Sequence, residues 1–258
     1  MDTLGEDLVL LSIRPEKGIV ATAQRIDYGL MGSELVRLAA SGRIDIQADR
    51  VIVRDQAPTG DAELDAALQS LVQSRRPPRP KAWVGRPRRG IRVAYLNRLA
   101  AAGVLRVEPG RIFGTRWYIA DHARVASASA RLDAIALSTG PVDTAASAYA
   151  GLAHAIGLDA ILYPGFGNRA VRKRMQQLAK GQPAAAAVTG AVADEAARAA
   201  TQAVTDAATM AATDAATHAA VHAATHAAVH GAVHAATQAS VEAAHHAGGG
   251  AGAGGGHH

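Results

Sequence analysis

The sequence predicts a mainly α-helical protein that ends in a low-complexity tail rich in Ala and His. Three observations support this fold class. Helical patterns of apolar residues recur through the first 182 residues, a helix–glycine–strand unit occurs twice, and Ala dominates from Pro183 onward. Because Ala has the highest helix propensity but supplies little core, the tail is expected to be helical or disordered. We therefore divide the chain into a folded domain, residues 1–182, and a tail, residues 183–258, with a Gly-rich end.

The repeated unit organises the first part of the domain. Residues 33–41 and 93–102 each show an amphipathic pattern, and Gly42 and Gly103 follow where a helix C-terminus favours a positive φ. Alternating apolar residues after each glycine predict paired strands. In the second copy these strands form a hairpin over residues 104–119.

Two more helical regions are predicted downstream. Residues 143–162 are typical of a largely buried helix with a break near Gly157, and residues 168–180 of a surface helix with Asn168 at its N-cap. His154 stands alone among apolar residues. We interpret it as a core histidine rather than a catalytic one.

Positive charge is concentrated in the domain. Its 182 residues hold 26 of the 27 Lys and Arg but 17 of the 22 Asp and Glu, a net of +9 against −4 for the tail. The segment Arg75–Arg92 contains eight cations in eighteen residues around Trp83, which we interpret as a structural anchor. Since uncompensated charge is not buried, this segment is expected to face water or an anionic partner.

Several function classes are disfavoured. Cys is absent, which excludes disulfides and thiolate chemistry. The chain lacks a phosphate-binding P-loop, an H-E-x-x-H motif and a nucleophile elbow, so neither an enzyme nor a cofactor is expected. Asp61 and Asp65 stand four apart, but Asp beside Thr59-Gly60 is more typical of turn and helix-start capping.

Two features bear on the cellular location. The N-terminus is acidic and lacks the pattern of a secretory signal, and no apolar run reaches the ~20 residues that span a bilayer. We expect a cytoplasmic protein, in which any membrane contact is peripheral. Abundant Arg and Ala are associated with GC-rich bacterial genomes.

The tail carries a histidine repeat with a four-residue period. This spacing allows two neighbouring imidazoles to share a metal. However, each histidine is rotated by ~40° from the last on a helix, and no carboxylate or Cys completes a tight site. The interpretation is a solvated repeat, and the only metal candidates are His218, His222, His226, His230 and His234.

An ordered set of motifs resembles the Golgi phosphoprotein 3 family. The most recognisable is A-P-T-G-D-A-E-L-D-A-A-L at Ala57–Leu68. L-G-E-D-L-V-L-L-S-I near the start resembles the family's opening helix. Further matches lie at Gly29–Ile44, Arg89–Leu105 and Gly151–Ala155, so that the resemblance covers roughly residues 4–180. The chain is thereby identified as a bacterial member of this family.

The resemblance implies a compact helical domain with a protruding β-hairpin. It also implies a peripheral membrane adaptor that recognises phosphatidylinositol 4-phosphate through two arginines one helical turn apart. Arg89 and Arg92 match these positions, and i, i+3 spacing would place both guanidinium groups on one helix face. Thr22 and Met31 replace a tryptophan and an arginine of the family pocket, and Arg25 or Arg88 are the candidates to compensate. The predicted headgroup contacts are Arg89, Arg92, Arg88, Arg25, Lys81 and Arg86.

The hairpin offers a second predicted contact. Ile112 and Phe113 near its tip are candidates for shallow insertion, with Trp117 at the membrane interface. The alternative is that these three residues cover the domain's own core or a dimer contact. The partners expected are an anionic membrane lipid and membrane-bound client proteins, and hairpins of the family suggest self-association.

A nucleic-acid-binding protein is the second hypothesis. Helix, glycine and a two-stranded wing also form the end of a winged helix, which reads DNA through a basic helix and a hairpin. Residues 33–41 and 93–102 carry few side chains suited to base edges, and the densest charge lies in a Pro- and Gly-broken segment instead. We therefore expect lipid rather than nucleic acid.

Overall fold

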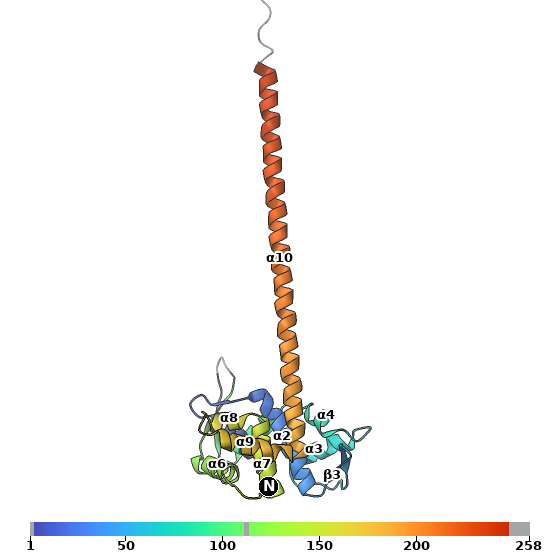
Figure 1. The fold of residues 1–258 in the computed structure, drawn as a ribbon, viewed down its shortest axis with the longest axis vertical. Helices are drawn as coiled ribbons and strands as arrows, with labels where there is room; N and C mark the ends of the chain where they lie inside the picture. Colours follow the sequence, from blue (N-terminus) through green and yellow to red (C-terminus); the bar gives the residue numbers. More distant parts are fainter. Residues whose placement is uncertain (1–2, 111–113, 248–258) are drawn as a thin grey trace, which may run out of the picture. The chain divides into compact units, whose positions relative to one another are not determined.

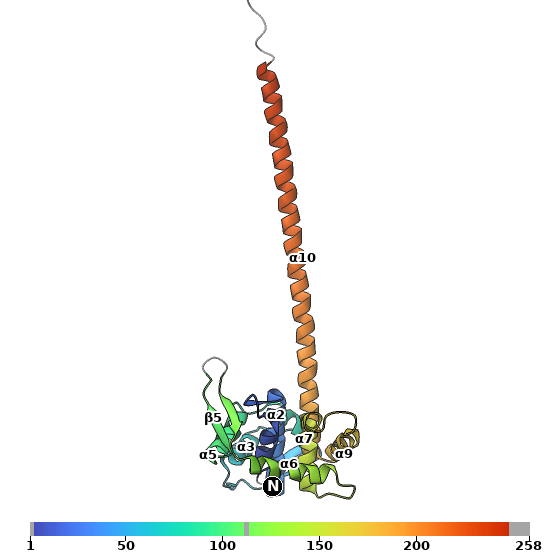
Figure 2. The same cartoon turned by 90° about the vertical axis from the view of Figure 1, so that its left-hand side faces the viewer.

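The computed structural model describes residues 3–110 and 114–247, with some side chains from residue 211 onward left outside that description. The chain divides into two compact units, Met1–Ala196 and Ala197–His258. Helices dominate, which confirms the predicted fold class (Figures 1 and 2). The helices of the first unit are α1 (Leu4–Ser12), α2 (Ala23–Ala40), α3 (Ala62–Val72), α4 (Pro80–Val84), α5 (Ile91–Ala101), α6 (His122–Ala136), α7 (Thr144–Ala155), α8 (Leu158–Leu162), α9 (Arg169–Lys180) and the beginning of α10 (Pro183–Ala247).

Strands occur only in small antiparallel hairpins among the described residues. The repeated unit of the sequence yields two of them, each after a helix and a glycine with φ near +72°, as predicted. In the hairpin of the second copy, Leu105 pairs with Ile119 and Glu108 with Arg116. The three pairs are β1 (Ile13–Arg14) with β2 (Ile19–Val20), β3 (Ile44–Gln47) with β4 (Arg50–Val53), and β5 (Leu105–Glu108) with β6 (Arg116–Ile119).

The core of the first unit is built around α1, α2 and α7. In Figure 2, α2 lies between α5 on one side and α9 on the other. Gly32 permits a close approach: a Cβ there would lie 2.6 Å from Cγ2 of Val188 and 2.7 Å from Cδ2 of Leu152. Because no larger residue fits, α2, α7 and the beginning of α10 meet directly at this glycine.

The predicted break in the downstream helix is present. Gly157 adopts φ +80° and separates α7 from α8, as expected from the sequence. Asn168 occupies the N-cap position of α9, but its side chain caps no amide; its Nδ2 donates to the Pro164 carbonyl instead.

The boundary of the domain differs from the expected residue 182. The first compact unit continues to Ala196, because Val188 and several alanines of α10 are buried against α2 and α7. Composition concealed this, since alanines that fill a close helix contact look the same in sequence as alanines of a solvated repeat. The buried residues of this segment are Ala184, Ala185, Ala187, Val188 and Ala191.

The second unit is helical over its described residues. Val204, Met210 and Val221 are all exposed, so this part of α10 offers no core of its own. The threonines of the repeat donate their hydroxyl groups to the carbonyl four residues earlier, as Thr205 does to Thr201 at 2.9 Å. These threonine hydroxyls are thus satisfied within one helix.

The buried beginning of α10 and its exposed continuation are expected to respond differently to the same substitution. Val188→Asp places an unpaired charge in the core and should lower the free energy of unfolding by about 3 kcal/mol or more. Val204→Asp, on the exposed part, should change it little. Urea unfolding of the two full-length variants measures the difference, and equal effects would contradict a core role for the start of α10.

Candidate functional site

The basic segment Arg75–Arg92 is divided between the interior and the surface. Arg88 turns inward and forms a bidentate ion pair with Glu34, whose side chain is fully buried. Nη2 of Arg88 lies 2.7 Å from Oε1 of Glu34. The same guanidinium lies 3.0 Å from Oε2 of Glu63. Arg88 was predicted as a headgroup contact, but these carboxylates hold it inside the domain.

Burial governs the chemistry of this pair. Desolvation raises the pKa of Glu34 to about 7, against the opposing effect of the hydrogen bonds from Arg88. Arg88 also lies against Met31, with Nη1 4.0 Å from Sδ. Met31 is the residue that replaces the arginine of the family pocket. Arg88 packs beside Met31 but does not restore a surface charge at that position.

Arg89 and Arg92 lie on either side of the start of α5, and they differ in their contacts. Arg89 is exposed and forms no ion pair or hydrogen bond among the described residues. Arg92 donates to the carbonyl of Ala23, and its Nε lies 3.7 Å from Oδ1 of Asp27. Because α5 begins at Ile91, Arg89 precedes the helix, and the one-face geometry inferred from i, i+3 spacing does not apply.

The start of α5 is suited to an anion. Its N-cap, Gly90, has φ +80° and provides no side-chain hydrogen bond, and the first turn contains no acidic residue. The amide groups of a first helical turn lack intrahelical partners and carry the positive end of the helix dipole. Arg89 and Arg92 therefore add their charges to an already electropositive helix end.

The neighbouring start of α2 carries strain and unsatisfied polar atoms. Thr22 has φ +53°, in the left-handed region that a β-branched residue rarely adopts. Its Oγ1 and Oδ1 of Asp27 are buried without a hydrogen-bond partner among the described residues. Burial raises the pKa of Asp27, and the charge of Arg92 acts in the opposite direction. Such features cluster at binding sites, where a ligand completes the missing contacts.

The other predicted headgroup residues are scattered around this site. Arg25, in the first turn of α2, is exposed, and so is Arg86 in the α4–α5 connection. Lys81 forms an ion pair with Asp194 at 3.0 Å within the first unit. Only Arg25 can be linked by contacts to the Arg92 site, because Arg92 donates to Ala23, two residues away.

Of the three hairpin residues predicted to contact a membrane, the structure describes only Trp117. Ile112 and Phe113 lie outside the described residues. Trp117 is 8% exposed and belongs to the core, and its amide donates to the Gly18 carbonyl at 2.8 Å. Its indole is therefore placed in the domain interior, which was the alternative to an interfacial role. Trp83 is also buried and donates to Ser70 Oγ at 3.1 Å, as expected for an anchor.

The acidic residues of the A-P-T-G-D motif have structural roles. Asp61 caps α3 by accepting from the Glu63 and Leu64 amides, and Asp65 accepts from the amide and hydroxyl of Thr59. Capping was predicted for both. Asp61 also bridges Arg37 and Arg98, each at 2.8 Å, which the sequence analysis does not predict. These hydrogen bonds outweigh burial and lower the pKa of Asp61 to about 2.

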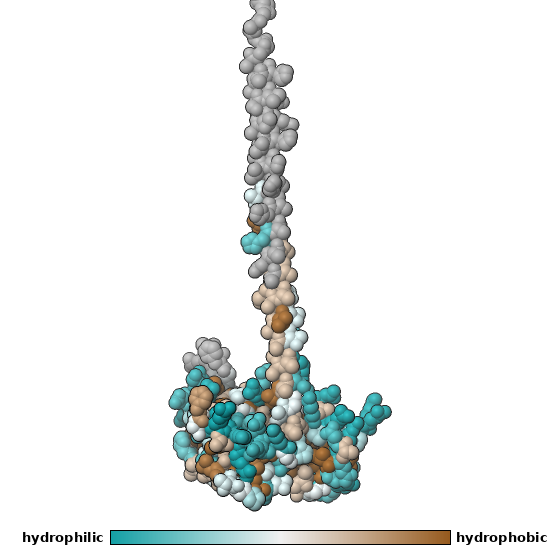
Figure 3. Space-filling view, in the orientation of Figure 1, coloured by the Kyte–Doolittle hydropathy of each residue, from teal (hydrophilic) through white to brown (hydrophobic). Residues whose placement is uncertain are grey.

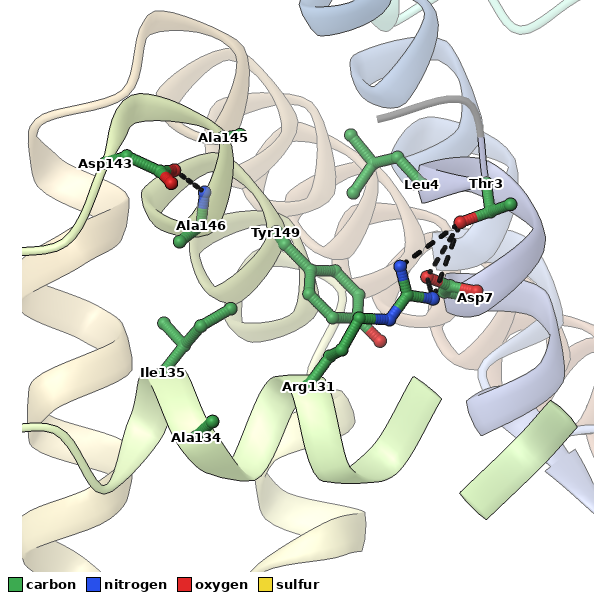
Figure 4. Close-up of a pocket in the computed structure, with 10 residues that line it drawn as sticks. All are labelled: Thr3, Leu4, Asp7, Arg131, Ala134, Ile135, Asp143, Ala145, Ala146 and Tyr149. Atoms are coloured by element: carbon green, nitrogen blue, oxygen red, sulfur yellow. Dashed lines mark hydrogen bonds and ion pairs between the residues drawn. The ribbon is translucent and has the colours of Figure 1, made fainter. Parts of the chain in front are cut away.

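A separate cavity of about 280 Å³ lies between α1, α6 and α7 (Figure 4). Its charged groups already have partners. Arg131 points to Asp7 and Thr3 at the start of α1, and Asp143 caps α7 by accepting from the Ala146 amide. The polar part of this cavity thus joins helices together rather than awaiting a ligand.

The metal candidates fall mostly beyond what is described. His218 is exposed, whereas the side chains of His222, His226, His230 and His234 lie outside the described residues. Within the described part, no group of three or more His, Cys, Asp or Glu is close enough to hold a metal. His154 is not a fully buried core residue: its Nδ1 lies 2.7 Å from Oδ2 of Asp159, and the ring is 25% exposed.

The comparison with known families agrees with the motifs. The family described as Golgi phosphoprotein 3 (GPP34) matches residues 4–195, so the chain belongs to this family. The matched region ends next to Ala196, where the first compact unit ends. None of the described helices combines the length and the apolar character that a membrane span requires.

Removing Arg88 is expected to destabilise the protein in a pH-dependent way. Arg88→Ala leaves Glu34 buried without its cation, which should lower the free energy of unfolding by about 3 kcal/mol at pH 8. Burial raises the pKa of Glu34 from 4.5 to about 7 even with Arg88 present, so stability falls as pH rises from about 4.5 through about 7. Without Arg88, which lowers this pKa, the fall extends to higher pH. Chemical unfolding at several pH values should therefore show a smaller loss near pH 5.

The control is Arg88→Ala combined with Glu34→Gln. Removing the carboxylate should flatten the pH dependence and recover part of the stability at pH 8. A loss of stability that is independent of pH in the single variant would show that Glu34 is not the group responsible.

Proposed function

We propose that this member of the Golgi phosphoprotein 3 family is a peripheral membrane adaptor that binds an anionic, phosphoinositide-type headgroup at the start of α5. The family is a non-catalytic adaptor family known for binding phosphatidylinositol 4-phosphate. The observation that carries the proposal is Arg89, an exposed cation with no partner among the described residues, at an uncapped helix N-terminus beside Arg92.

The chemistry of the site suits a phosphate monoester. Guanidinium groups donate paired hydrogen bonds to phosphate oxygens, and first-turn amides add donors that point along the helix axis. Asp27, whose Oδ1 lies 3.7 Å from Nε of Arg92, acts against binding of an anion while it is ionised.

The site departs from the family pocket in ways that bear on selectivity. The positions of Thr22 and Met31 lack the family's tryptophan and arginine, and Arg88 is held by Glu34 and Glu63. Arg25 is the remaining candidate to add a charge. We therefore propose that the site selects ligands by their negative charge and by an accessible phosphate group, and that it does not select one particular inositide. Insertion of Ile112 and Phe113, and self-association through the hairpin, stay predictions.

Arg89→Ala/Arg92→Ala is expected to weaken binding to anionic vesicles by about thirtyfold, since each cation near a charged bilayer contributes about 1 kcal/mol. Co-sedimentation measures the effect, with vesicles of neutral lipid as the blank and with phosphatidylserine and phosphatidylinositol 4-phosphate vesicles matched to each other in total charge. Arg75→Ala/Arg76→Ala is the control, because it removes two exposed arginines of the same basic segment.

Two outcomes would contradict the proposal. Equal losses in the two double variants would indicate nonspecific adsorption rather than a dedicated site. Binding to duplex DNA at physiological salt, without binding to any vesicle, would favour the nucleic-acid hypothesis instead.

A further inference from the structure

We propose that the α8–α9 connection, residues 163–168, is a second membrane contact, in which Phe166 enters the interface of an anionic bilayer while cations of α9 hold the surrounding phosphates. The inference rests on the proposed function in one respect, that the partner is an anionic membrane. It concerns residues that the headgroup site at α5 does not use.

Phe166 is the most exposed of the aromatic side chains in the described part of the chain, at 93%. It lies between Gly165 and Gly167, and the space around both glycines is open. A single exposed apolar residue is common on protein surfaces and carries no conclusion by itself. The surroundings of Phe166 supply the further observations.

The connection is held in place from both sides. Nη1 of Arg172 donates to the carbonyls of Tyr163 and Gly165, the latter at 2.9 Å. Asn168 donates to the Pro164 carbonyl at 3.0 Å, and the Tyr163 hydroxyl donates to Asp133 at 2.6 Å. Phe166 is therefore presented on an ordered loop, so that inserting it requires little additional ordering.

A cationic groove adjoins this loop. The groove encloses about 830 Å³ and is lined by Arg169, Arg172 and Lys173, together with the hydrogen-bonded pair of His154 and Asp159. Arg169 and Lys173 are exposed and have no acidic partner among the residues described. Figure 3 shows a dense area of hydrophilic side chains over α8 and α9 on this face.

The placement of these cations is unfavourable without an anion. They occupy the first turns of α9, where the helix dipole is positive, and the first turn contains no acidic residue. Asn168 provides no side-chain cap to the free amides. Asp159 contacts His154 and forms no ion pair with Arg169 or Lys173 among the described residues. Phosphate groups in the groove would relieve both the mutual repulsion of the cations and the unfavourable dipole.

The groove is connected by contacts to the headgroup site. Arg92 donates to Ala23 at the start of α2. Arg25 follows Ala23 by two residues and contacts Gly157, the N-cap of α8. Its Nη1 lies 3.1 Å from the position that a Cβ on Gly157 would occupy. Ala160 of α8 then lines the cationic groove. A chain of contacts that includes the exposed Arg25 thus joins the start of α5 to the groove at α9.

A bilayer fits this surface better than a nucleic acid does. Proteins that bind single strands stack successive bases on several aromatic side chains, whereas Phe166 has no exposed aromatic neighbour in the described part of the chain. The neighbouring exposed residue of α8 is aliphatic, Ile161. An aromatic residue surrounded by cations is the pattern expected of insertion at a headgroup boundary.

Because the chain contains no Cys, a single label reports on the loop. Gly167→Cys in the full-length protein places an environment-sensitive fluorophore beside Phe166, and Gly140→Cys places it in the α6–α7 connection; space is open at both positions. On vesicles of phosphatidylcholine and phosphatidylserine, emission from position 167 should increase and shift to the blue. Emission from position 140 should change little, and Phe166→Ala should suppress the signal at 167.

Affinity measurements complete the test. Phe166→Ala should weaken binding to these vesicles by about tenfold, and Phe166→Trp should preserve it. Arg169→Ala/Lys173→Ala should weaken binding on anionic but not neutral vesicles. Lys180→Ala, at the other end of α9, removes one cation as a control and should have a smaller effect per cation removed.

The outcomes separate this inference from the proposed function. Vesicle binding that depends on Arg89 and Arg92, with a silent label at 167 and no effect of Phe166→Ala, overturns the second contact alone. A responding label and residual binding in Arg89→Ala/Arg92→Ala support the second contact even if the headgroup site fails. Absence of vesicle binding overturns both, and a Phe166 requirement for single-stranded RNA but not for vesicles overturns the membrane assignment.

Discussion

The ion pair between Arg88 and Glu34 decides how the charge of this domain is distributed. Glu34 lies fully buried on a helix at the centre of the fold, and a carboxylate there requires a cation. Arg88 meets that requirement and turns the basic segment inward at one position. The chain then reverses through Gly90, so that Arg89 is left on the surface at the start of α5. The ion pair with Glu34 thus gives Arg88 a structural role, whereas Arg89, the next residue, remains a candidate ligand-binding residue.

The same principle operates elsewhere in the domain. Asp7 is buried and paired with Arg124 and Arg131 from α6, and Asp61 joins Arg37 to Arg98. These contacts link α1 to α6 and α3 to α2 and α5. Arginine suits them because its planar guanidinium donates several hydrogen bonds in fixed directions. A substantial part of the positive charge therefore stabilises the fold, and only the remainder is available to an anionic partner.

The sequence was sufficient for features that depend on local chemistry. Gly42, Gly103 and Gly157 were recognised as helix-ending positions, and Asp61 as a cap, because these roles follow from backbone conformation within a few residues. It was insufficient where partners are distant in the chain. Glu34 stands among Leu30, Leu35 and Leu38, and an acid on an apolar helix face is itself a sign that a buried cation must exist. Its identity, 54 residues away, required the fold.

The groove at α9 illustrates a different reason for incomplete prediction. Arg169, Arg172 and Lys173 at i, i+3 and i+4 were expected to face water, as they do in part, but the sequence did not show that Arg172 also holds the loop that bears Phe166. This dual role has a consequence for membrane attachment. A single headgroup site that lacks two of its family side chains would bind weakly, whereas the two proposed contacts on one folded domain would act together with a high effective concentration. Loss of selectivity at α5 would then be compatible with firm attachment, because the proposed second contact would respond to the charge of the bilayer rather than to one lipid.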